Sequence, residues 1–93
     1  MFVGLSQFEL FIPDSGSLKS KRFVLSSLKA RLRNRFNVSV AEVGDTEKWQ
    51  RVTLGVVTIA NEQRFVDEML AKIYNFVEGE RQVQILGYRS EIL

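Results

Sequence analysis

Residues 36–60, FNVSVAEVGDTEKWQRVTLGVVTIA, contain two strand patterns separated by a polar connection. Phe36, Val38 and Val40 alternate with polar or small residues, which predicts a half-buried strand over residues 36–43. Residues 51–60 are rich in β-branched side chains and predict a second strand. Polar residues and a glycine fill the connection over residues 44–49, so the two strands are expected to form a hairpin.

Helical patterns lie on both sides of this hairpin. The first is a stripe of four leucines at intervals of 7, 3 and 4 residues, namely Leu18, Leu25, Leu28 and Leu32. It predicts a helix that begins after the turn residues 13–17, among them a candidate N-cap, and ends near Asn34. The second is a stripe at intervals of 4, 4 and 3 residues, namely Phe65, Met69, Ile73 and Phe76. We expect Asn61 to cap this second helix and Gly79 to end it.

Two further strands complete the chain. Residues 2–12 alternate through Phe8, Leu10 and Ile12, although Val3 and Leu5 have the opposite parity, which leaves open a bulge near Gly4 or an end covered on both faces. Residues 81–92 also alternate, with a phase change beside Gly87. The order βαββαβ is the ferredoxin-like pattern. We therefore predict one α+β domain over residues 1–93, a four-stranded antiparallel sheet with two helices on one face.

The strand at residues 51–60 is apolar on both parities, with Val52, Leu54 and Val56 on one side and Val57 and Ile59 on the other. A sheet with one solvated face normally alternates. A second copy of the chain is the simplest cover for the face without helices, which predicts a homodimer or higher oligomer. The alternative is a central strand whose outer side carries a few exposed apolar residues.

Composition excludes most familiar active sites. The 93 residues include no cysteine and no histidine, which removes thiol nucleophiles, disulfides and imidazole chemistry. Glu42, Asp45 and Glu47 lack the glycine and the ligand register of a calcium loop, and no glycine-rich phosphate motif occurs. We predict no cofactor, no metal and no enzymatic activity. Because residues 1–13 carry neither a basic leader nor a membrane-spanning apolar run, we expect a cytoplasmic protein without membrane contact.

The charges are divided unevenly along the chain. Residues 15–41 contain seven basic residues and no acidic one, whereas the rest of the chain has six basic and eleven acidic residues. The net charge of +2 therefore conceals a cationic helix on an acidic body, an asymmetry that favours a polyanionic partner. Lys19, Arg22, Lys29 and Arg33, with Ser26 between them, form one stripe along this helix and are the predicted nucleic-acid-binding residues. Two alternatives remain, a solvated basic face and a protein-docking surface.

Several segments together resemble the YlxP-like family of small bacterial proteins of unknown function. They are Ser17–Arg22 (SLKSKR), Arg33–Asp45 (RNRFNVSVAEVGD), Trp49–Arg51 and Ser90–Leu93. The resemblance implies a ferredoxin-like fold and, in many bacteria, a gene near those of translation initiation and ribosome maturation factors, which suggests contact with RNA or the ribosome. It assigns no catalytic residue. Our leading hypothesis is a non-enzymatic binding module for structured RNA or the ribosome, and the alternative is an oligomeric structural or regulatory protein-interaction domain.

Overall fold

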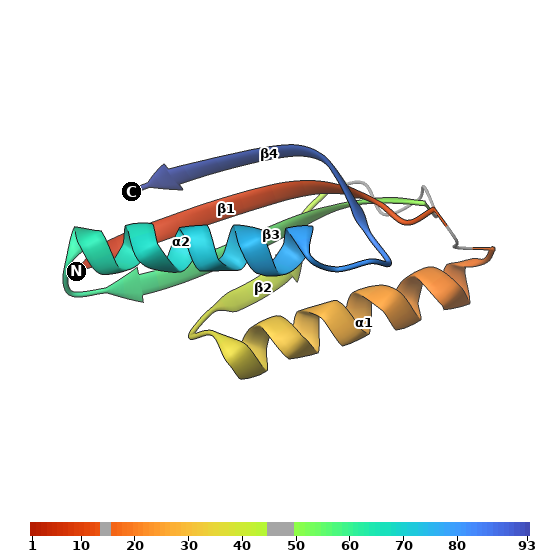
Figure 1. Cartoon of the computed structure of the whole chain (residues 1–93), viewed down its shortest axis with the longest axis horizontal. Helices are drawn as coiled ribbons and strands as arrows, with labels where there is room; N and C mark the ends of the chain where they lie inside the picture. Colours follow the sequence, from red (N-terminus) through yellow and green to blue (C-terminus); the bar gives the residue numbers. More distant parts are fainter. Residues whose placement is uncertain (14–15, 45–49) are drawn as a thin grey trace.

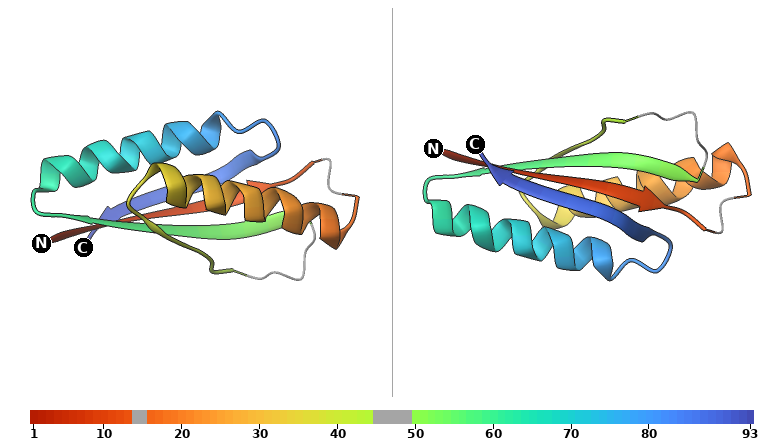
Figure 2. Two further views of the ribbon diagram at one scale, coloured as in Figure 1. Left: turned by 90° about the horizontal axis from the view of Figure 1, so that it is seen from below. Right: turned by 90° about the horizontal axis from the view of Figure 1, so that it is seen from above.

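The computed structural model describes residues 1–13, 16–44 and 50–93, which form a four-stranded sheet and two helices. The elements are β1 (Phe2–Phe11), α1 (Leu18–Arg35), β2 (Ser39–Glu42), β3 (Arg51–Ala60), α2 (Gln63–Glu78) and β4 (Gln84–Ile92). All paired strands are antiparallel, in the order β2-β3-β1-β4. In Figure 1 α1 lies below the strands and α2 overlaps β3, and Figure 2 shows both helices on one face of the sheet and the other face open. The predicted ferredoxin-like architecture is confirmed.

Strand alternation decides which face of the sheet meets the helices. Phe8, Leu10 and Ile12 of the first strand segment are at most 1% exposed, and so are Leu54 and Val56 of β3. Ile59, on the open face, is 51% exposed. The register between β1 and β3 is continuous from Phe2↔Ala60 to Phe11↔Arg51, so there is no bulge near Gly4. The predicted phase change beside Gly87 is confirmed, because the β1–β4 register shifts between Glu9 and Leu10, opposite that glycine.

Gly4 belongs to the helix-facing side of β1. A Cβ atom at this position would overlap the side chain of Val66 and lie 3.2 Å from a methyl group of Leu70. Because glycine has no side chain, the beginning of α2 packs directly on the strand. This close approach explains why the hydrophobic alternation of β1 breaks at its start.

Several predicted boundaries are wrong. The strand expected over residues 36–43 spans only Ser39–Glu42, because the Phe36 N–H donates to the Leu32 carbonyl at 2.9 Å and so completes α1. The strand expected over residues 81–92 begins at Gln84. Asn61 is not the cap of α2, since Glu62 occupies the N-cap position with extended backbone angles and makes no side-chain cap bond.

The predicted stripe of α2 is off by one position. The buried residues of this helix are Val66, Leu70, Ile73 and Val77. Phe65 is 39% exposed, and Met69 and Phe76 are half-buried at the side that faces α1. Only Ile73 of the predicted four lies fully in the core. Two of the displaced residues, Met69 and Phe76, line a groove between the helices.

Candidate nucleic-acid interface

Helix α1 begins and ends with residues suited to its polarity. Ser17 is its N-cap and accepts a hydrogen bond from the Ser20 N–H at 3.1 Å, as the turn composition predicts. Arg33 and Arg35 lie in the last turn, where cations interact favourably with the helix dipole. Leu25, Leu28 and Leu32 are buried, but Leu18 of the predicted stripe is 47% exposed. Burial of this apolar face leaves most cations on the flanks of the helix.

One flank of α1 lies along β2, and two predicted binding residues are held there. The Lys29 ammonium forms an ion pair with Glu42 at 2.8 Å, and the two side chains are 23% and 27% exposed. Arg33 Nη2 donates a hydrogen bond to the carbonyl oxygen of Val40 at 3.0 Å. The Lys29 charge is therefore largely neutralised, whereas Arg33 retains its charge because its partner is an uncharged carbonyl.

A hollow of about 440 Å³ lies below this flank, between α1 and the edge strand β2. Its lining consists of Leu18, Lys21, Arg22, Leu25, Ser26, Lys29 and Glu42. Three residues of the predicted stripe, Arg22, Ser26 and Lys29, therefore line the same hollow. A carboxylate, that of Glu42, also belongs to this hollow, so its inner end is less cationic than the helix sequence indicates.

The first two turns of α1 carry two of the exposed predicted cations. Lys19 and Arg22 are exposed, and within the described residues neither forms an ion pair. Lys21, between them, is only 3% exposed and has contacts within the chain. Phe23 is 72% exposed on the same turns. Lys19 and Arg22 therefore present charge to solvent at the beginning of the helix.

The other flank of α1 lies toward α2, and sequence reasoning missed its arrangement. Arg31 forms an ion pair with Glu80, and its guanidinium carbon lies 5.9 Å from the centre of the Phe76 ring. The Arg35 guanidinium carbon lies 5.6 Å from Phe76 and 6.0 Å from Phe36. These contacts join residues far apart in the sequence, and no local pattern indicates them.

A tyrosine cluster lies on the far side of α2, over β4. Tyr88 packs against Phe8 with ring centres 4.9 Å apart and against Tyr74 at 4.7 Å, and its hydroxyl lies 3.3 Å from Ser6 Oγ. A hydrogen bond to Glu78 and the charge of that carboxylate raise the pKa of Tyr74 above its usual value. The phenol therefore stays neutral and adds no charge to this side of the molecule.

One candidate set of oxygen ligands falls partly outside the described residues. Asp45 and Glu47, considered with Glu42 as oxygen ligands, lie in the segment 45–49, and Glu42 itself pairs with Lys29. In the described ranges, no cluster of three or more acidic residues has the arrangement of a metal site. Neither described helix is long and apolar enough to cross a membrane.

The sheet order and the two helices on one face define a protein of the ferredoxin-like class. Solved structures support this class. A mutant of SnoaB, a cofactor-independent oxygenase from Streptomyces nogalater, is similar with a TM-score of 0.52 and 9% identity, over 99% of this chain and 90% of that one. The de novo designed protein LFR1 1, with a ferredoxin fold, has a TM-score of 0.50 and 11% identity, over 100% and 83% of the two chains. At these identities the likeness concerns the fold alone.

Sequence comparison narrows the class to one family. Residues 3–90 match the model of the family described as "Protein of unknown function (DUF503)", and the chain belongs to this family. It is also 32% identical over 89 residues to the uncharacterized protein YlxP of Bacillus subtilis (strain 168), covering 96% of this chain and 97% of that protein. The predicted resemblance to the YlxP-like family is confirmed.

Proposed function

We propose that this protein is a non-enzymatic RNA-binding module that contacts the phosphate backbone through α1. The observation that carries the proposal is the exposure of Lys19, Arg22 and Arg33 on a helix that contains no acidic residue. At 1.5 Å per residue, the distance from Lys19 to Arg33 is about 21 Å, enough to follow several phosphates of one strand.

The ion pairs of α1 refine which cations bind. Lys29 is paired with Glu42 and Arg31 with Glu80, so both contribute less to a phosphate contact than their sequence positions indicate. Arg33 donates to a neutral carbonyl and remains exposed. Recognition therefore depends chiefly on Lys19, Arg22 and Arg33, with a smaller contribution from Lys29. Such contacts fix position on a backbone and carry little sequence information.

Amide chemical shifts of the ¹⁵N-labelled protein, titrated with an RNA hairpin of about 20 base pairs, test this proposal. We expect the largest shift changes in residues 17–35, because phosphates approach α1. The gene neighbourhood implied by the family resemblance makes a hairpin from ribosomal RNA the first ligand to use. Shift changes confined to the open sheet face, or none at millimolar RNA, would contradict the proposal.

A second candidate function, self-association through the open sheet face, is supported by a separate observation. Val3 pairs with Ile59 and Leu5 with Val57 across β1 and β3, and all four side chains belong to the face that the helices do not cover. Charges of both signs surround this apolar patch, namely Glu9, Arg51, Arg89 and Glu91. A two-fold arrangement of two copies would bury the patch and bring opposite charges together.

Light scattering after size-exclusion chromatography at about 50 µM tests self-association. We expect a mass twice the 10.7 kDa of the chain, and a return to 10.7 kDa for Leu5→Glu, which places a charge in the patch. Phe23→Glu is the matched control, because Phe23 is exposed on α1, away from this face. A wild-type protein that elutes with the mass of one chain rules the second candidate out.

A further inference from the structure

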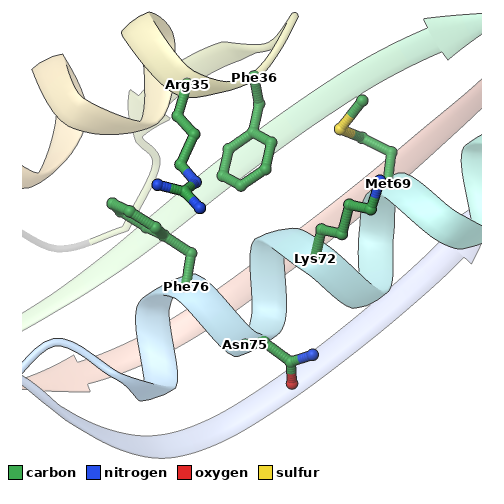
Figure 3. Close-up of a pocket in the computed structure, with 6 residues that line it drawn as sticks. All are labelled: Arg35, Phe36, Met69, Lys72, Asn75 and Phe76. Carbon is green, nitrogen blue, oxygen red and sulfur yellow. The ribbon is translucent and has the colours of Figure 1, made fainter.

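A groove of about 620 Å³ separates the C-terminal end of α1 from the middle of α2. It is lined by Arg35, Phe36, Met69, Lys72, Asn75 and Phe76. Figure 3 shows Arg35 and Phe36 projecting from the α1 side and Phe76 and Lys72 from the α2 side. The volume lies within the usual range of pockets for small ligands, about 300–1,000 Å³.

Flat surfaces form one part of this groove. The Phe36 and Phe76 rings meet edge to face, with centres 5.7 Å apart. The Arg35 guanidinium lies close to both rings, at 6.0 Å from Phe36 and 5.6 Å from Phe76. Phe76 is further restrained by Arg31, which is itself paired with Glu80. The groove therefore offers aromatic and guanidinium planes whose positions neighbouring residues fix before any ligand arrives.

The remaining polar groups of the groove are cationic or neutral. Arg35 and Lys72 contribute two positive charges, Asn75 contributes an amide, and no carboxylate belongs to the lining. In the part of the chain that the structure describes, neither Arg35 nor Lys72 forms an ion pair. Two cations without a counter-charge beside flat apolar surfaces suit a ligand that is both planar and anionic.

We propose that this groove binds one unpaired nucleotide of an RNA strand. The base stacks on the planes formed by Arg35, Phe36 and Phe76, and its phosphate lies between Arg35 and Lys72. Stacking on aromatic side chains is a main source of affinity in single-strand-binding proteins, and arginine adds a cation–π contribution. An acidic peptide would pair with the cations but would not stack on the aromatic rings. A nucleotide makes both kinds of contact and so fits the groove better.

This inference rests on the proposed RNA function and deepens it. Phosphates of a paired region lie along Lys19, Arg22 and Arg33 on the flank beside β2. The strand then passes around the C-terminal end of α1, so that an adjacent unpaired nucleotide enters the groove on the flank toward α2. RNA proteins commonly take sequence information from unstacked bases. The groove would then supply a preference for single-stranded ends or bulges that the phosphate contacts alone lack.

Fluorescence anisotropy with two labelled probes, the single strand rA8 and a fully paired hairpin without overhang, tests the groove. We expect Arg35→Gln plus Lys72→Gln to weaken rA8 binding about tenfold and hairpin binding less than about threefold. Phe76→Leu keeps an apolar side chain against the core but removes the ring, and we expect a loss of about fivefold for rA8 only. Arg64→Gln plus Arg81→Gln is the control with the same loss of charge, at exposed positions outside the groove.

The two probes separate failure of the groove from failure of the proposed function. Hairpin binding by the wild type together with no rA8 binding, or rA8 binding that the groove variants leave unchanged, overturns the groove alone. Equal losses on both probes overturn it too, because they indicate a general charge effect. If neither rA8 nor the hairpin binds, both proposals are overturned. Free AMP that competes with rA8 at micromolar concentration would assign the groove to a mononucleotide and overturn the strand assignment.

Discussion

The double charge reversal Lys19→Glu plus Arg22→Glu is expected to weaken RNA binding about 100-fold at roughly 0.1 M salt. Each lost phosphate contact lowers the logarithm of the binding constant by about 0.7–0.9 at that concentration. The new carboxylates also repel the phosphates. Binding is measured by fluorescence anisotropy with the paired hairpin. Both side chains are exposed, and neither has an ion-pair partner in the described residues.

These two positions separate binding from folding. They lie in the first turns of α1, where acidic residues interact favourably with the positive end of the helix dipole. The reversal should therefore leave thermal stability unchanged or slightly higher. By contrast, Lys29→Glu would place a second carboxylate beside Glu42 and confuse lost binding with lost stability.

Arg64→Glu plus Arg81→Glu supplies the matched control for this reversal. Both arginines are exposed and lie outside α1, and the change in net charge is identical. Arg64 lies 3.5 Å from Glu62, but these side chains are 71% and 49% exposed, so solvent screens the new carboxylate and the reversal is expected to change stability little. We expect the control to weaken binding less than about threefold, through the general field of the protein alone. Equal losses from the two double variants would show that α1 has no special role.

Truncation of Phe8 is expected to have the largest effect on stability. Phe8 is fully buried in the middle of β1, and it packs against Tyr88 with ring centres 4.9 Å apart and against Tyr74 at 6.2 Å. Phe8→Ala leaves a cavity that the sheet and α2 cannot close, and such changes cost about 3–5 kcal/mol. This is a large part of the total stability of about 5–15 kcal/mol typical of a domain.

Urea unfolding measured by circular dichroism gives the free-energy difference. Phe23→Ala is the matched control, since it deletes the same side chain at a position that is 72% exposed, and we expect it to cost less than about 0.5 kcal/mol. A cost below about 1 kcal/mol for Phe8→Ala would mean that Phe8 is not a central residue of the core.

Much of the fold follows from local pattern because its elements alternate clearly between buried and exposed positions. The strand segments at residues 2–12 and 51–60 and the helix beginning at Leu18 were all predictable in this way. The side of α2 that faces the sheet was not, because phenylalanines and valines of this helix compete for the buried stripe. Packing selects the smaller Val66, which fits over Gly4, and leaves Phe65 at the periphery.

The candidate interface was predictable only in part for a related reason. The concentration of cations in α1 is visible in the sequence, but their partners come from other elements. Glu42 on β2 neutralises Lys29, and Glu80 after α2 pairs with Arg31. The groove is formed by residues from both helices, so no local sequence pattern predicts the contact between Arg35 and Phe76.

Salt dependence of hairpin binding, measured for wild type and for Lys19→Glu plus Arg22→Glu, tests most directly whether phosphates lie along α1. With three phosphate contacts, the wild type should show a slope of about −2 to −3 in log affinity against log salt concentration. The reversed variant should retain a slope no steeper than about −1. Parallel lines for the two proteins, or affinity that salt does not change, would contradict binding through this helix.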